Sequence, residues 1–311
     1  MAITGVFSGT FSTNGDATVR LNGKEVAAYR APEPVRPLFT VPLRNRPLNN
    51  SVLADPKMKV ARARKHLQEL DASVQAYFAS NPFNFYEARN PETGDDVLHV
   101  VVSSPLPREA STMAGDAIQN LRSALDIMVC DLIRANNATP THNSGFPSSN
   151  EPSKARPKIQ GASAATEKFV LRLKGTKRWN DPLRLLQRLD NLHKHNRLMA
   201  VGAASVGVLA RVHMPGISMT PEGGIMFFGG PGGTPCMQQP GIPTHSGQVF
   251  LREGDNELYR LVPHFDEDVR ADIGVVFGAG EIGAGQGVRE TIFQLANLVE
   301  RILIVCERRV I

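Results

Sequence analysis

DPLRLLQRLDNLHKHNRLM, residues 181–199, carries the clearest structural pattern of this 311-residue sequence. Its leucines recur at steps of three and four, which predicts an amphipathic helix over 182–199, opened by Asp181-Pro182. The seam expected to face a core consists of Leu185, Leu189, Leu192 and Met199. A polar stripe is expected on another side of the same helix, and it consists of Arg184, Arg188, Asn191 and His195.

The same periodicity predicts three more helices, over 55–79, 108–136 and 286–309. Each has one apolar stripe, so packing all four into a bundle would bury every stripe. Runs of β-prone residues predict a small hairpin over 83–103 and a mostly antiparallel sheet within 201–285. We therefore expect an α+β fold in which residues 51–200 and a closing helix at 286–311 form a four-helix bundle around an inserted sheet.

Residues 1–50 predict a β-hairpin followed by a proline-rich arm. FSGTFS and ATVRLNGKEVAAYR lie on either side of the turn TNGD. Five prolines and three arginines between residues 31 and 50 leave little room for regular hydrogen-bonded structure. Because such an arm suits packing on a neighbour, we expect a protein partner or a second subunit for residues 1–50.

Composition indicates a soluble cytoplasmic protein, with 41% hydrophobic and 21% charged residues. The longest weakly polar run, 198–210, is too short to span a bilayer, and the N-terminus has no secretory pattern. Three widely spaced cysteines without a CxxC pair favour reduced thiols, and no metal or cofactor site is predicted. GAGEIG at 278–283 matches the dinucleotide fingerprint formally, but no βαβ unit has room to follow it.

The net charge of +5 permits a polyanionic partner. The most basic stretch, 154–178, is rich in Lys and Arg and is expected to be a loop that attracts RNA. Within it, the residues expected to contact nucleic acid are Lys174, Lys177 and Arg178.

Arg188 and His195 are the candidate catalytic pair. They lie seven residues apart, so on a helix they share a face at a separation of about 10 Å along the axis. A phosphodiester fits between them, or Arg188 of one copy meets His195 of its partner. Arginine would hold phosphate oxygens while histidine moved a proton, which suits RNA cleavage through the ribose 2′-hydroxyl. The alternative is a solvated stripe in which His195 favours the helix C-terminus through its dipole.

The Arg188-(six residues)-His195 spacing resembles the R-x4-6-H motif of the HEPN superfamily. In addition, GDAIQNLRSALD (115–126) and LDNLHKHNRL (189–198) resemble paired helices of a broad group of uncharacterised bacterial proteins. The resemblance covers about residues 55–200 and the last helix. It implies a HEPN-like four-helix bundle and a metal-independent endoribonuclease, or an RNA-binding descendant, that acts as a homodimer. His193 also fits the motif, but helical geometry turns it about 140° away from Arg188.

Three polar residues of the 108–136 helix are candidate supporting residues, together with Arg184, Asn191 and His193. Asp116, Asn120 and Arg122 would orient the arginine or the histidine of the 182–199 helix. Alternatively, they would stabilise the bundle through buried hydrogen bonds. Arg122 is also expected to pair with Asp126, one turn away. The alternative function is a non-catalytic scaffold or assembly protein of phage or mobile-element type, which would clasp a neighbouring subunit with its N-terminal arm.

Overall fold

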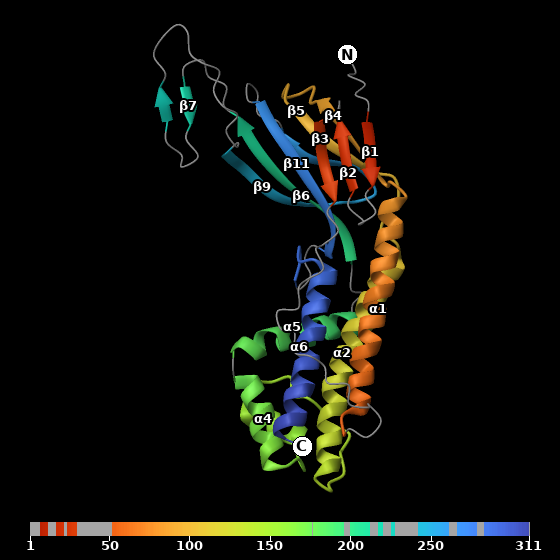
Figure 1. Ribbon diagram of the computed structural model, residues 1–311, viewed down its shortest axis with the longest axis vertical. Coiled ribbons are helices and arrows are strands. Elements are labelled where there is room, and N and C mark those ends of the chain that lie inside the picture. The colour runs from red at the N-terminus through yellow and green to blue at the C-terminus, as the bar shows by residue number, and fades with distance from the viewer. Residues whose placement is uncertain are drawn as a thin grey trace. The chain divides into compact units, whose positions relative to one another are not determined.

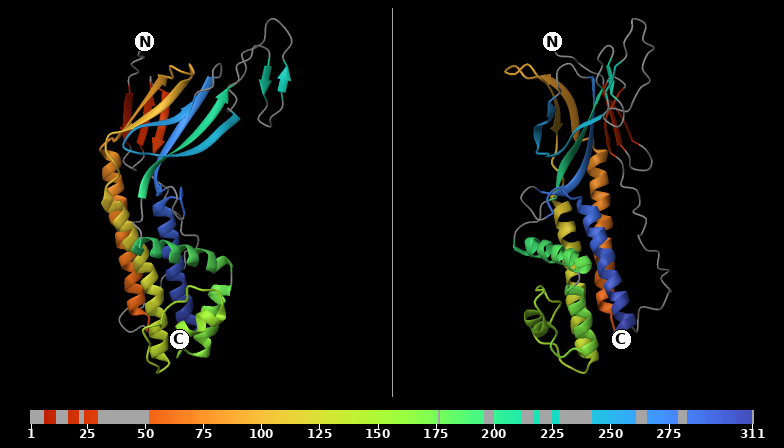
Figure 2. Two further views of the ribbon diagram at one scale, coloured as in Figure 1. Left: turned by 180° about the vertical axis from the view of Figure 1, so that it is seen from behind. Right: turned by 90° about the vertical axis from the view of Figure 1, so that its left-hand side faces the viewer.

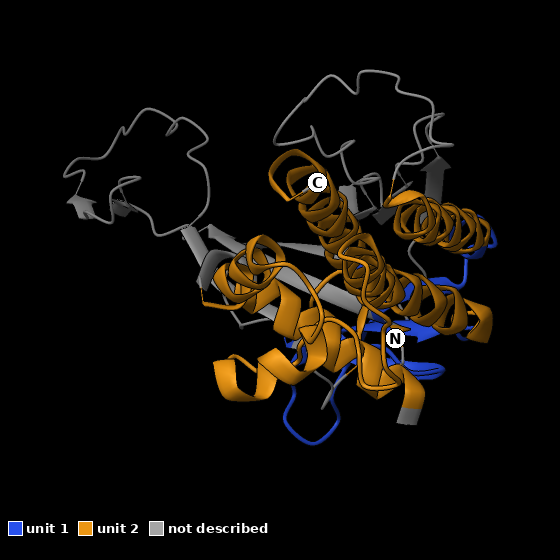
Figure 3. Cartoon of the chain, turned by 90° about the horizontal axis from the view of Figure 1, so that it is seen from below, with its two compact units in different colours: residues 1–38, 77–105, 201–274 blue, residues 39–76, 106–200, 275–311 orange. Residues whose placement is uncertain are grey.

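The computed structural model describes most of the chain and divides it into two compact units. One unit comprises residues 1–38, 77–105 and 201–274, and the other comprises 39–76, 106–200 and 275–311 (Figure 3). The described residues are 7–11, 17–21, 24–29, 52–175, 177–195, 200–211, 217–219, 225–227, 242–260, 266–278 and 283–310. We call the first the sheet unit and the second the helical unit.

Three long helices run lengthwise in the helical unit, and their bounds lie close to the predicted ones (Figures 1 and 2). They are α1 (Ala54–Ala79), α2 (Arg108–Ala135) and α6 (Val288–Arg309). The apolar seams expected for α2 and α6 are buried throughout, since none of their residues is more than 3% exposed. These residues are Ile118, Leu121, Leu125, Met128 and Leu132 of α2, and Val288, Ile292, Leu295, Val299, Ile302 and Cys306 of α6. No described helix is long and apolar enough to cross a membrane.

A single hydrophobic core joins α1, α2 and α6 with a fourth helix, α5 (Lys177–His195). Leu67, Ile118, Leu186 and Ile292 represent the four helices in it, and all four side chains are buried. Burying each such side chain contributes roughly 1.5–3 kcal/mol, so this shared core supplies most of the driving force for folding. The prediction that the four helices share one core is confirmed.

The arrangement of α5 differs from a simple lengthwise bundle, because it crosses α2 and α6 instead of running along them (Figures 1 and 2). It also begins five residues before Pro182, which therefore lies inside the helix. The buried face consists of Leu183, Leu186 and Leu189, whereas Leu185 and Leu192 of the expected seam are only partly buried. Met199, the last residue of that seam, lies outside the described residues.

The basic stretch at 154–178, expected as a loop, contains helical segments. These are α3 (Pro152–Ala155), the 3-10 helix η2 (Arg156–Ile159) and α4 (Ala164–Gly175). The loop prediction was wrong because Val170 and Leu173 form a buried apolar stripe on α4. Burial of this stripe in the core stabilises the helix. Ser163 and Thr166 stabilise the start of α4, where Thr166 N–H donates to Ser163 Oγ at 3.2 Å.

The sheet unit contains a six-stranded sheet in the order β1-β2-β3-β11-β6-β9. Its strands are β1 (Phe7–Phe11), β2 (Ala17–Leu21), β3 (Lys24–Tyr29), β11 (Asp266–Phe277), β6 (Ala200–Arg211) and β9 (Ile242–Phe250). The N-terminal strands therefore join this sheet as a three-stranded meander and not as a separate hairpin arm. β3 meets β11 in parallel, with Ala27 opposite Ala271. The proline-rich part of the predicted arm lies outside the described residues.

The predicted hairpin over 83–103 is confirmed as β4 (Phe83–Arg89) and β5 (Asp96–Val102). β10 (Gly254–Arg260) pairs with the other edge of β5, which completes a three-stranded antiparallel sheet. β7 (Ile217–Met219) and β8 (Ile225–Phe227) form a further antiparallel pair. The end of the GAGEIG segment, Gly283, adopts a φ of +82° in the connection to α6. In the described part of the chain this connection joins one strand to one helix, and no βαβ unit follows it.

Candidate functional site

The exposed side of α5 carries the predicted polar stripe as far as the structure describes it. Arg184, Arg188 and Asn191 are all exposed. Neither arginine forms an ion pair with a carboxylate among the described residues, while Asn191 Oδ1 accepts a hydrogen bond from Gln187 Nε2 at 2.9 Å. Two guanidinium groups without a carboxylate partner in the described part of the chain thus lie one helical turn apart.

The position of the His195 side chain, the second member of the predicted catalytic pair, is not described. His195 is the last residue of α5, but its side chain lies outside the described part of the structure. The same applies to the side chains of Lys177 and Arg178. Arg188 and His195 as a catalytic pair, with Lys177 and Arg178 as RNA contacts, therefore stay predictions.

His193 faces α2 and not the exposed stripe. Its ring lies directly against Gly115, where any side chain larger than hydrogen would collide with it. Its Nε2 is 3.9 Å from Asp116 Oδ1, and its side chain is 21% exposed. The glycine of the GDAIQ segment therefore allows α2 and α5 to approach closely at this point.

Of the three polar residues predicted to support α5, two contact that helix or its charges. Asp116 is near His193, and Arg122 lies close enough to Asp190 for the two charges to interact. Asn120 instead donates from Nδ2 to the Asp116 carbonyl of its own helix at 2.8 Å. None of the described contacts of these residues involves Arg188.

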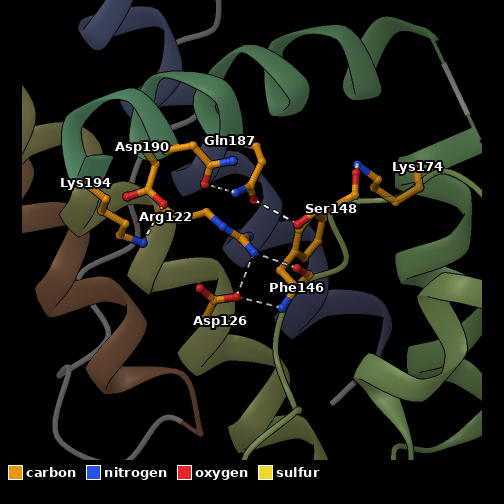
Figure 4. Close-up of polar contacts among 9 residues, drawn as sticks. Arg122, Asp126, Phe146, Ser148, Lys174, Gln187, Asp190 and Lys194 are labelled. Atoms are coloured by element: carbon orange, nitrogen blue, oxygen red, sulfur yellow. Dashed lines mark hydrogen bonds and ion pairs between the residues drawn. The ribbon is translucent and has the colours of Figure 1, made fainter. Parts of the chain in front are cut away.

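Arg122 and Asp126 clamp one residue of the loop that precedes α3 (Figure 4). The guanidinium donates from Nη2 to the Phe146 carbonyl at 2.7 Å, and Phe146 N–H donates to Asp126 Oδ1 at 2.8 Å. The predicted pair between Arg122 and Asp126 is confirmed, with 3.0 Å between Nη2 and Oδ1. Burial lowers the pKa of Arg122, and the charges of Asp126 and Asp190 oppose that shift. This clamp leaves the Arg122 side chain 10% exposed.

Lys174 fastens the same loop from α4 (Figure 4). Although it was predicted as a surface contact for nucleic acid, it is only 3% exposed, because its position follows the apolar stripe of α4. Its Nζ donates to the Ser148 carbonyl at 3.2 Å and lies 6.0 Å from the centre of the Phe146 ring. Burial, together with the charges of Arg122 and Arg184, lowers the pKa of Lys174 to about 8.

The segment 145–148 is thus attached to three helices, a site that the sequence did not reveal. Beyond the contacts with α2 and α4, Ser148 Oγ donates to Gln187 Oε1 of α5 at 3.2 Å. A Cβ on Gly145 would lie 2.8 Å from Asp126 Oδ1, so glycine is needed beside the clamp. The sequence feature that could have indicated this site is a charged residue directly after a core leucine, as in Leu121-Arg122 and Leu173-Lys174.

Asp190 and Asn180 each have a buried side-chain oxygen that can accept a hydrogen bond. Asp190 is 1% exposed, and its Oδ2 accepts a hydrogen bond from Lys194 Nζ at 2.6 Å. Its Oδ1, like Oδ1 of the buried Asn180, has no hydrogen-bond donor among the described residues. Such acceptors cost free energy when left without a donor.

The sheet unit has a polar cluster of its own on β4, β5 and β10. Tyr86 and His99 are direct partners across β4 and β5, and their rings stack with centroids 4.9 Å apart. His99 Nδ1 lies 3.0 Å from Asp255 Oδ2 on β10. Cross-strand pairs of this kind contribute roughly 0.2–1 kcal/mol each, so the cluster adds modestly to the pairing of these three strands.

The described residues contain no group of three or more His, Cys, Asp or Glu side chains placed to hold a metal ion. The candidate site is a cationic one, built from the exposed arginines of α5 and the buried Lys174 and Arg122. Comparison with protein-family models, curated proteins and solved structures finds no match to this chain.

Proposed function

We propose that this chain is an RNA-binding, HEPN-like protein that cleaves RNA without a metal, using Arg188 and His195 at the seam of a homodimer. The observation that carries the proposal is the pair of exposed arginines on α5, neither of which is neutralised by a described carboxylate. The core shared by α1, α2, α5 and α6 supports the assignment to a HEPN-like four-helix bundle.

Uncompensated arginines on a rigid helix suit a phosphate backbone. Arg184 and Arg188 are one turn apart, so their Cβ atoms are separated by about 5–6 Å. Guanidinium groups bind phosphate oxygens in a fork, and each such contact releases condensed counterions from the nucleic acid. The opposite face of α5 is packed in the core through Leu186 and Leu189, which fixes the direction of the arginines.

In the proposed reaction, Arg188 binds the non-bridging oxygens of the scissile phosphate. His195 accepts the proton of the ribose 2′-hydroxyl as that oxygen attacks phosphorus, and the bond from phosphorus to the 5′-oxygen breaks. Water protonates the departing 5′-oxygen. Arg188 stabilises the additional negative charge that develops on the phosphate oxygens.

The test is cleavage of mixed RNAs by the purified full chain in EDTA. We expect His195→Ala to abolish cleavage while RNA affinity stays largely unchanged, because a proton-transfer group acts mainly on the barrier. Arg188→Ala should lose both rate and some affinity, since its charge engages phosphate before reaction as well. His142→Ala and Arg62→Ala, both at exposed positions outside α5, are the matched controls.

The homodimer is tested by mixing the two inactive variants. If Arg188 of one copy works with His195 of its partner, a mixed dimer of Arg188→Ala and His195→Ala contains one intact site and regains cleavage. A catalytic pair within one copy gives no recovery. Wild-type protein that neither binds nor cleaves RNA would overturn the proposal and favour the alternative role in assembly.

A further inference from the structure

Lys174 is a buried cation with few partners among the described residues. An ammonium group carries three donors, yet its one hydrogen-bond acceptor among the described residues is the Ser148 carbonyl. No described carboxylate pairs with it, although the side chain is almost fully buried. Buried ammonium groups are normally paired with a carboxylate, because an uncompensated charge is costly to remove from water.

The surroundings of Lys174 add positive charge and do not offset it. Arg122 lies 5.8 Å from the centre of the Phe146 ring, and Lys174 lies 6.0 Å from it, so one ring separates two cations. The charge of Arg184, which is exposed on α5, also acts on Lys174. Asp126 is already engaged by Arg122 and by Phe146 N–H. Arg122 and Lys174 therefore both lie near the Phe146 ring, and the charge of Arg184 acts on Lys174 as well. Asp126 pairs with Arg122.

We infer that Lys174 and Arg184 bind a terminal phosphate group of RNA. This inference rests on the proposed function and names the part of the RNA that is recognised. A phosphate inside an RNA strand is flanked by riboses on both sides, so it cannot reach a side chain that is 3% exposed. A phosphate at a strand end projects freely and carries nearly two negative charges at neutral pH.

Further polar groups near Lys174 are available to such a ligand. A hydrogen bond joins the exposed Ser148 to the half-buried Gln187, and the Ser148 carbonyl is the group to which Lys174 donates. With a pKa of about 8, Lys174 is mostly protonated at pH 7 and so retains its charge for binding. A bound dianion would raise that pKa, because an opposite charge favours the ammonium form.

The experiment compares one RNA oligonucleotide with a 5′-phosphate, with a 3′-phosphate, or with hydroxyl groups at both ends. Wild-type chain should bind one of the phosphorylated forms at least about tenfold more tightly than the unphosphorylated form, as expected for charge-assisted hydrogen bonds. Lys174→Met should abolish the preference, and Arg184→Ala should reduce it. Lys168→Met, which removes an exposed lysine from the same helix, should retain it.

Inorganic phosphate provides a second measurement that does not depend on RNA. It should stabilise the wild-type chain against thermal unfolding, and the Lys174→Met variant should show no such stabilisation. Arg184→Ala keeps the inference testable if Lys174→Met does not fold, because Arg184 is exposed. Wild-type chain that binds all three oligonucleotides equally would overturn the terminal-phosphate site and leave RNA binding intact. Lys174-dependent binding of inorganic phosphate without any RNA binding would instead uphold the phosphate site and overturn the proposed function.

Discussion

The two faces of α5 use polar residues in opposite ways. On the inner face, Asp190 is 1% exposed and bonded to Lys194, and His193 lies against Gly115. On the outer face, Arg184 and Arg188 are exposed without described carboxylate partners. Polar groups that face inward hold the helix in place, while those that face outward remain available to a ligand. Substitutions on the inner face should therefore change the stability of the fold, whereas substitutions on the outer face should change ligand binding.

The largest effect is expected on the inner side, from Arg122→Met. This change removes the donor to the Phe146 carbonyl and leaves Asp126 without its cation. Removing one partner of a fully buried ion pair typically costs about 3–5 kcal/mol. Asp126 is 40% exposed, so unfolding in denaturant should show a loss near or below the lower end of this range. Phe146 and the loop that contains it should also become more susceptible to proteolysis.

Arg134→Met is the matched control for this prediction. Arg134 lies on the same helix and pairs with Asp131 at 2.8 Å, but its side chain is 60% exposed. Exposed pairs contribute about 0–1 kcal/mol, so the control should be nearly neutral. Equal losses for Arg122→Met and Arg134→Met would show that the clamp on Phe146 does not stabilise the fold.

A smaller loss is expected from Gly115→Ala, at the contact between α2 and α5. In an open helix position alanine would stabilise by roughly 1 kcal/mol relative to glycine. At Gly115 the new methyl group meets the His193 ring, so we expect a net loss of about 1–3 kcal/mol, the usual cost of overpacking. Thermal or denaturant unfolding measures it.

Two further variants check that the His193 ring causes this loss. Gly175→Ala places a methyl group where no atom of the described residues lies within 4 Å, so it should not destabilise. His193→Ala combined with Gly115→Ala should recover much of the loss, since the colliding ring is gone. A double variant no more stable than Gly115→Ala alone would place the cause elsewhere.

Helix periodicity predicted the four long helices well, because each amphipathic stripe is local information. It misplaced the buried face of α5, where leucines at 183, 185, 186, 189 and 192 allow more than one seam. Tertiary packing against α2 selects Leu183, Leu186 and Leu189. Helix α4 was missed because its many basic residues suggested a loop, although Val170 and Leu173 already marked a buried stripe.

The candidate site was predictable only in part, and the reason is physical. Arg184, Arg188 and Asn191 share a face because of helical spacing alone, which a sequence shows directly. The clamp on Phe146 joins residues 122 and 146, and Lys174 reaches residue 148 from another helix. Contacts between distant segments depend on how helices pack, so no local pattern places Lys174 beneath α5.

Burial of Lys174 predicts a pH dependence of stability. Its pKa falls from the usual 10.5 to about 8 in the folded chain, so between these values the unfolded chain holds more protons. Unfolding then takes up protons, and raising the pH through this window stabilises the folded state. Relative to Lys174→Met, the wild-type free energy of unfolding should rise between pH 8 and 10.5, by at most about 1.4 kcal/mol per pH unit. Parallel profiles for the two proteins would mean that Lys174 titrates normally.

The smallest effect on stability is expected on the outer face, from Arg188→Ala. The side chain is exposed and has no described ion pair, so the free energy of unfolding should change by less than about 0.5 kcal/mol. Binding should respond differently, because losing one phosphate contact lowers the slope of log affinity against log salt by about 0.7 for single-stranded nucleic acid. Titrations of RNA at several salt concentrations measure that slope. An unchanged slope with unchanged stability would mean that Arg188 does not contact the RNA backbone. A large loss of stability would mean that Arg188 stabilises the fold.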